Sequence, residues 1–150
     1  MAKMYRFPAP GDQAIIKVPL RGLMEFRIRP HTVPNTTSDD RVVGLVSSAL
    51  TDAGIGADGA PGVAPHLNAT VGLFLLPDLG GRVVPIVYLS VWGKATPLHQ
   101  DKPTPMCLWR SPTNHSGTCG ADQVDELCAT LLSNCLDEFI EHWKAANGVA

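Results

Sequence analysis

Apolar residues near the C-terminal end of the chain recur every three or four positions, which is the period of an α-helix. The apolar stripe runs from Val124 to Trp143 within the segment Ala121–Asn147. Asp122 is expected to cap the start of this helix, and Gly148 is a stop signal. A stripe of this breadth is typical of a helix that lies across a sheet.

A second helix is predicted nearer the N-terminus, after a strand. Leu23–Arg29 alternates apolar and polar side chains with the period of two that is typical of a half-buried strand. After a bend over residues 30–34, Thr37 or Ser38 is expected to cap a helix that runs to Ala53. This helix is predicted to be a crossover between two strands.

Three further strands are predicted in the second half of the chain. Leu67–Leu76 and Val83–Trp92 flank a turn at residues 77–81, so they are expected to form a hairpin. Pro105–Arg110 is the final strand. The stretch 55–66 is rich in Gly, Pro and Ala, which predicts a long loop rather than a domain boundary.

The order of these elements predicts the fold class. Two helices placed on one face of a four- or five-stranded mixed or antiparallel sheet give a two-layer α+β sandwich. A chain of 150 residues is suited to one domain. Residues 1–13 are interpreted as a flexible lead-in, residues 14–20 as a short strand, and 14–150 as the single domain.

A two-layer sandwich leaves one sheet face without helices. Alternation places Phe74, Ile86, Tyr88 and Trp92 on that face, and Trp109 is expected to join them from the last strand. Grouped exposed apolar residues mark an interface or a ligand surface. Three alternatives stay open: the N-terminal segment or loops cover this face, copies of the chain associate through it, or it binds a partner or apolar ligand.

Composition and net charge indicate which classes of molecule are not expected as the main partner. Charged residues make up 17% of the chain, fewer than the ~25% that is usual for soluble domains. The net charge is −2 and the basic residues are scattered along the sequence, so neither nucleic acid nor an anionic membrane is expected as the main partner. No apolar run approaches the ~18 residues of a membrane span.

Four cysteines lie in the C-terminal third of the chain: Cys107, Cys119, Cys128 and Cys135. The last two are seven residues apart on one helix, about 10.5 Å, which is too far for a disulfide. Disulfides from Cys107 and Cys119 to the helix, a single Cys107–Cys119 disulfide, and four free thiols all remain possible. No C-x-x-C spacing is present, and neither a metal nor a cofactor is expected.

The loop before the last helix contains residues that support one enzyme hypothesis. Cys119 lies just ahead of a helix N-terminus, where the helix dipole favours a thiolate, and His115 is four residues away as a candidate base. Together they would define a small thiol-dependent enzyme. The surrounding Ser, Thr, Asn and Gly residues are equally typical of an exposed loop.

Parts of the sequence resemble small exported bacterial proteins of unassigned activity. The resemblance covers roughly residues 40–147 and rests on the AL..AGI pattern of the first helix, the strand end VYLSVWG and the helix LLSNCLDEFIEHWKAANG. The layout is also similar in outline to the envelope lipoprotein that partners the lipopolysaccharide-assembly barrel. The resemblance implies an exported location and a non-catalytic role, and it supplies no catalytic residues.

The preferred hypothesis is therefore a non-enzymatic interaction or assembly module that is exported to the periplasm, with a cytoplasmic location as the alternative. It would use its apolar and aromatic sheet face and its Pro- and Gly-rich loops to self-associate or to hold a protein partner. The alternative functions are the thiol-dependent enzyme built on Cys119 and His115 and a carrier of an apolar ligand.

Overall fold

The computed structural model of the chain describes residues 20–96, 99–115 and 117–150. The predicted lead-in, and the predicted strand up to residue 19, lie outside the described residues. The elements are β1 (Arg27–Thr32), α2 (Asp39–Asp52), β2 (His66–Leu76), a 3-10 turn (Pro77–Leu79), β3 (Arg82–Ala95), β4 (Thr104–Arg110), β5 (Asn114–His115), a second 3-10 turn (Ala121–Gln123) and α3 (Val124–Asn147).

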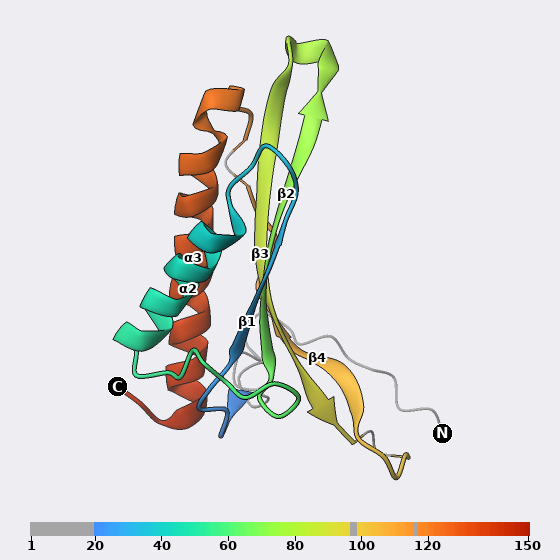
Figure 1. Cartoon of the computed structure of the whole chain (residues 1–150), viewed down its shortest axis with the longest axis vertical. Helices are drawn as coiled ribbons and strands as arrows, with labels where there is room; N and C mark the ends of the chain where they lie inside the picture. The colour runs from blue at the N-terminus through green and yellow to red at the C-terminus, as the bar shows by residue number, and fades with distance from the viewer. Residues whose placement is uncertain (1–19, 97–98, 116) are drawn as a thin grey trace.

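The strands form one mixed sheet in the order β1-β2-β3-β4, with the short β5 also paired to β3. β1 runs parallel to β2 because α2 provides the crossover between them, whereas β2, β3 and β4 are antiparallel neighbours. Figure 1 shows both helices on the same side of this sheet. The predicted two-layer α+β sandwich with two helices on one face is confirmed.

α2 has the start and the buried stripe that the sequence predicts. The Ser38 hydroxyl accepts a hydrogen bond from the Arg41 backbone N–H at 3.1 Å, so Ser38 is the N-cap. Val42, Val46 and Leu50 are fully buried at four-residue spacing against the sheet.

α3 ends as predicted but begins differently. The chain enters through the 3-10 turn, and the Gln123 side chain accepts a hydrogen bond from the Gly120 N–H at 3.2 Å. The helix proper starts at Val124, so the predicted N-cap at Asp122 is wrong. Gly148 adopts the left-handed conformation, with φ of 67°, and ends the helix.

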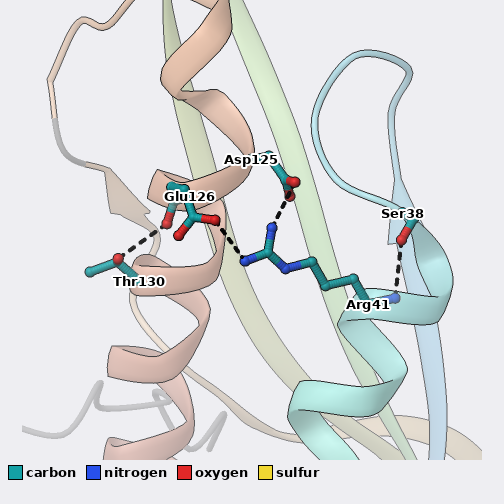
Figure 2. A network of polar contacts seen from close by, with 5 residues as sticks. All are labelled: Ser38, Arg41, Asp125, Glu126 and Thr130. Carbon is teal, nitrogen blue, oxygen red and sulfur yellow. Dashed lines mark hydrogen bonds and ion pairs between the residues drawn. The ribbon is translucent and has the colours of Figure 1, made fainter.

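One arginine joins the two helices at their N-terminal ends. The Arg41 guanidinium lies 2.6 Å from the Asp125 carboxylate and 3.1 Å from that of Glu126, as Figure 2 shows. The hydrogen bond to Glu126 raises the pKa of Arg41. A hydrogen bond from Thr37, together with Arg41, lowers the pKa of Asp125. These acidic residues also complement the positive N-terminal end of α3.

β1 starts and ends later than the predicted strand. Phe26 is fully buried, whereas Met24 is 56% exposed and precedes the strand. Pro30, expected in a bend, lies inside β1. Proline is tolerated there because β1 is an edge strand, so the missing N–H breaks no bond within the sheet.

The core lies between the sheet and the helices, and aromatic rings fill its centre. The Phe139 ring of α3 makes edge-to-face contacts with Phe26, at 5.4 Å between centroids, and with Trp109, at 5.2 Å. The Trp109 indole N–H donates to His142 Nδ1 at 3.1 Å. A buried indole needs such an acceptor, so this bond fixes the face of the sheet on which Trp109 lies.

The last turn of α3 holds the residues that precede β1. The Trp143 indole N–H donates to the Leu23 carbonyl at 2.6 Å, and the Asn147 side chain donates to the Leu20 carbonyl at 3.1 Å. The Asn147 amide oxygen accepts from the Gly22 N–H at 2.8 Å. These three bonds, called the terminal clasp below, join positions more than a hundred residues apart.

The hairpin of β2 and β3 extends beyond the helices, at the top of Figure 1. Its end carries three exposed apolar side chains: Phe74 is 59% exposed, Leu75 is 72% exposed and Leu79 is 54% exposed. The helical layer does not cover this part of the sheet, which is why the burial of alternate residues fades from Leu73 onward.

Candidate interaction surface

The sheet face that carries no described helix is called the open face below. Along β3, Val87, Leu89 and Val91 are fully buried toward the helices. The residues between them therefore point the other way. This places four of the predicted face residues, Phe74, Ile86, Tyr88 and Trp92, on the open face, where Trp92 is 41% exposed.

Trp109 does not lie on the open face. It is 3% exposed and packs against α3. The reason is a β-bulge: Cys107 pairs with Trp92 and Trp109 pairs with Val91, so Leu108 is an extra residue in β4. The extra residue reverses the alternation of side chains between the two faces, so the Trp109 side chain points into the core. The placement of Trp109 with the other aromatic residues is corrected.

The middle of the open face is a shallow groove of about 480 Å³. Two contacts order its walls. The Arg110 guanidinium lies 4.3 Å from the centroid of the Tyr88 ring, and the Trp92 indole N–H donates to the Ser90 hydroxyl at 3.2 Å. The groove is lined by His31, Asn68, Thr70, Tyr88, Ser90, Trp92, Cys107 and Arg110.

The floor of this groove contains a polar atom that lacks a partner. The side-chain oxygen of Asn68 is buried and accepts no hydrogen bond from the described residues. A buried acceptor without a donor costs roughly 1–3 kcal/mol. This oxygen is therefore an acceptor that the described residues leave unused.

Strand register gathers basic residues that are scattered in the sequence. The described strands contain no Asp or Glu, and all their Lys and Arg residues occupy positions on the open-face side: Arg27, Arg29, Arg82, Lys94 and Arg110. His31, His66 and His115 share this face. Basic residues that are scattered along the sequence therefore share one face of the sheet.

One row across the sheet shows the spacing of this charge. Arg29 of β1 pairs with Asn68 of β2, Asn68 with Ser90 of β3, and Ser90 with Arg110 of β4. Three strand spacings of about 4.8 Å separate the two arginine backbones by about 14 Å. Burial, with the charges of Arg29 and Arg27, lowers the pKa of His66 in the neighbouring row.

All four cysteines are free, which agrees with the alternative of four free thiols and does not support the disulfide alternatives. Cys107 is exposed on the open face, whereas Cys119, Cys128 and Cys135 are buried. Cys107 pairs with Trp92 and Cys119 with Val83, nine residues or about 30 Å apart along β3. The sheet itself separates Cys107 from the two thiols of α3.

The two thiols of α3, Cys128 and Cys135, are held in their neutral form. Burial raises the pKa of Cys128 to about 11, and it also raises the pKa of Cys135. The Cys135 thiol donates to the Val87 carbonyl at 3.7 Å and accepts from the Asn114 amide at 3.5 Å. Neutral, hydrogen-bonded thiols of this kind are core residues.

The structure does not bring the two residues of the enzyme hypothesis together. Cys119 is 2% exposed, and its backbone N–H and carbonyl both bond to Val83. His115 is exposed and pairs with Ile86, at an open-face position. The two side chains thus belong to opposite sides of the sheet, three residues or about 10 Å apart along β3.

An apolar cavity of about 310 Å³ lies at the end of the sheet that is remote from the hairpin tip. It is formed mainly by the loop before β2 and by β3 and β4, with Leu23, Val63, Trp92 and Leu108 among its walls. Ligand pockets begin at about this volume. The sequence pattern did not indicate it, because its walls come from a Gly- and Pro-rich loop without periodicity.

The described residues contain neither a cluster of metal ligands nor a helix that could span a membrane. Within residues 20–96, 99–115 and 117–150, no three His, Cys, Asp or Glu side chains are placed to hold a metal ion. Neither described helix is long and apolar enough to cross a membrane.

The chain is a two-layer α+β protein with one open, basic sheet face. No family model matches it, and no curated protein does. Three solved chains are similar in structure. One of them is a minor lipoprotein from Acinetobacter baumannii, with 13% identity, a TM-score of 0.45, and coverage of 82% of this chain and 94% of that one. Function therefore has to be argued from the geometry of the chain itself.

Proposed function

We propose that the protein is a non-enzymatic interaction module that holds another protein on the open face of its sheet. The observation that carries this proposal is the composition of that face. Trp, Tyr and Arg are the residue types that dominate binding energy at protein interfaces. Here Tyr88, Trp92, Arg29 and Arg110 lie together on adjacent rows of one face.

The face is also ordered before any partner arrives. It is built on strands whose opposite side is packed against the helices, and the Arg110 and Trp92 side chains have partners on the face itself. A surface that is already ordered loses less conformational entropy on binding.

The exposed apolar residues of the hairpin extend this surface. Phe74 lies on the same face as Ile86, one strand away, and both continue toward the exposed tip. A partner that covers the groove and the hairpin would contact a polar, basic centre and an apolar end. The Gly- and Pro-rich loop of residues 56–65 lies at the other end of the sheet, beside the apolar cavity.

Photocrosslinking in the native host tests this proposal. A photoreactive amino acid at Thr70 sits in the groove, and the same group at Thr51, an exposed position of α2, is the matched control. We expect a discrete crosslinked product from position 70 that is absent from position 51 and is lost when Trp92 and Tyr88 are both changed to Ser. Equal crosslinking from both positions would overturn the proposal.

We also propose an exported location, which is supported by the resemblance of the sequence to small exported bacterial proteins. Fractionation of host cells that express the natural gene tests it. Recovery of the protein with the periplasmic or envelope fraction is the expected result. Recovery with the cytoplasmic marker alone would favour the cytoplasmic alternative, and it would leave the proposal for the open face intact.

A second candidate function, carriage of an apolar ligand, is favoured by the apolar cavity. A fluorescent apolar probe such as anilinonaphthalene sulfonate is expected to bind there if this function holds. Val63 lines the cavity and is 81% exposed, so Val63→Glu adds a charge at the cavity without disturbing the core. Probe binding that is unchanged in Val63→Glu would exclude the cavity as the binding site.

A further inference from the structure

Charge is divided between the two layers of the fold. The strands hold five basic residues and no acidic one. The helices show the opposite balance, with eight acidic residues against two basic ones, Arg41 and Lys144. The acidic residues are Asp39, Asp40 and Asp52 of α2 and Asp125, Glu126, Asp137, Glu138 and Glu141 of α3. The open face and the helical surface are thus complementary in charge.

Much of this charge has no ion-pair partner within the described residues. The ion pairs there all involve Arg41, with Asp125 and Glu126. Asp137 and Glu141 are exposed and lie four residues apart on the outer side of α3. On the open face, Arg29 is exposed, and Arg110 contacts the ring of Tyr88 rather than a carboxylate.

This distribution excludes one mode of self-association and favours another. A symmetric dimer that joins two open faces would place Arg29 and Arg110 of both copies in one interface, and like charges at an interface cost several kcal/mol. A head-to-tail contact instead places the basic face of one copy against the acidic helices of the next. It also completes a three-layer helix–sheet–helix arrangement, in which the sheet is covered on both faces.

We propose that the occupant of the open face is the acidic outer surface of α3 from a second copy of this chain. This inference rests on the proposed function and names the partner. Arg29 and Arg110 receive carboxylates such as Asp137 and Glu141, while Trp92 packs against the helix between them. Because the two contact surfaces differ, each bound copy presents a new open face, and the contact repeats.

A single-stranded nucleic acid is the other polyanion that a basic sheet with aromatic residues can bind. Such binding uses several free rings on which successive bases stack. On this face the Tyr88 ring is already covered by the Arg110 guanidinium, which leaves the Trp92 indole and the His31 imidazole as the exposed rings among the described residues of the groove. The geometry favours carboxylates paired with arginine over stacked bases.

Sedimentation velocity of the purified chain tests this assignment. We expect weight-average mass to rise with protein concentration at low salt and to fall toward the monomer at high salt, because salt screens exposed charges. Arg29→Glu with Arg110→Glu, and separately Asp137→Lys with Glu141→Lys, are each expected to weaken association by about tenfold or more. All four positions are exposed, so both variants are expected to keep the circular dichroism spectrum and urea midpoint of the wild type.

A mixture of the two variants provides the decisive result. Each reversed surface then meets a surface of opposite charge on the other variant, so association is expected to return although neither variant associates alone. Asp78→Lys with Asp101→Lys is a matched control, because it changes net charge by the same amount as Asp137→Lys with Glu141→Lys at exposed turns outside the groove and outside α3. This control is expected to associate like the wild type.

The outcomes separate this inference from the proposed function. A wild type that stays monomeric at every concentration and salt, or a mixture that fails to associate, overturns the second copy as the occupant. If position 70 still crosslinks in the host to a different protein, the open face remains an interaction surface. If a short oligothymidine binds and Arg29→Glu with Arg110→Glu abolishes that binding, the occupant is nucleic acid and the inference falls.

Discussion

Cys107 and Trp109 lie two positions apart in β4 and yet belong to opposite faces of the sheet. Cys107 is exposed opposite Trp92, whereas Trp109 is buried opposite Val91. In a regular strand they would share a face. The bulge at Leu108 therefore separates a thiol on the candidate interaction surface from an indole in the core, and both assignments can be measured.

The thiols should react at very different rates. In the native state we expect one thiol per chain to react rapidly with Ellman's reagent and all four to react in denaturant, because Cys107 is exposed and the others are buried. The raised pKa of Cys128, about 11, further suppresses its thiolate near neutral pH. Cys107→Ser should remove the rapid phase.

Cys119→Ser is the matched control for this measurement. It should leave the rapid phase unchanged, since the Cys119 backbone is hydrogen-bonded to Val83 near the start of β3 and the residue is 2% exposed. A rapid phase that disappears in Cys119→Ser and persists in Cys107→Ser would contradict the placement of both residues. It would also restore the hypothesis of a thiol-dependent enzyme.

Substitution of Trp109 and substitution of Trp92, on either side of the bulge, should change the free energy of unfolding by different amounts. Trp109→Ala removes a buried indole and its bond to His142, so we expect the free energy of unfolding to fall by about 3–5 kcal/mol. Trp92→Ala should change it by roughly 0.5 kcal/mol or less, as is usual for exposed positions. Urea denaturation measures both. Similar losses in the two variants would place both rings in the core.

His66 reports on the charge of the open face. Burial, followed by Arg29 and Arg27, lowers its pKa below the ordinary value of 6.5. Arg29→Gln should raise that pKa, and an NMR titration of the imidazole measures the shift. Because the folded pKa is the lower one, the unfolded chain binds more protons as pH falls through 6.5, so this site loses its stabilising contribution below that pH. The loss should be smaller in Arg29→Gln.

The charge-conserving variant Arg29→Lys controls for the size of the side chain. It should keep the pKa of His66 near the wild-type value. A rise as large as that of Arg29→Gln would mean that Arg29 lowers the pKa of His66 by burying the imidazole rather than by its charge.

The terminal clasp should govern the stability of the segment before β1. Asn147→Ala removes the bonds to Gly22 and Leu20, and we expect a loss of roughly 1–3 kcal/mol in the free energy of unfolding. The Gly22 amide should also exchange its hydrogen faster than in the wild type. Ala145→Ser, an exposed change two residues away, is the control and should alter neither quantity.

The parts of the fold that depend on local pattern could be predicted from the sequence. Ser38 caps α2 because a hydroxyl before an apolar stripe is a local signal, and β3 alternates regularly because one of its faces is buried throughout its middle. The positions of Tyr88 and Trp92 on the open face follow from that alternation alone.

Features that depend on pairing between strands could not be predicted in the same way. The bulge at Leu108 changes no residue type, so alternation places Trp109 on the wrong face. The row from Arg29 to Arg110 exists only once register aligns four strands that are separated in sequence by up to 81 positions. The separation of Cys107 from Cys119 likewise follows from their partners on β3, which spacing along the chain does not reveal.

The terminal clasp also has a consequence for the order in which the protein acquires its structure during synthesis. Trp143 and Asn147 leave the ribosome after every strand of the sheet, and they bond to Leu20, Gly22 and Leu23, which leave it before the first strand. All the strands are therefore made before α3 can cover the helical side of the sheet, where α2 is the helix already present. During that interval the chain depends on its own collapse or on a chaperone to keep β1 and β2 from pairing with another chain.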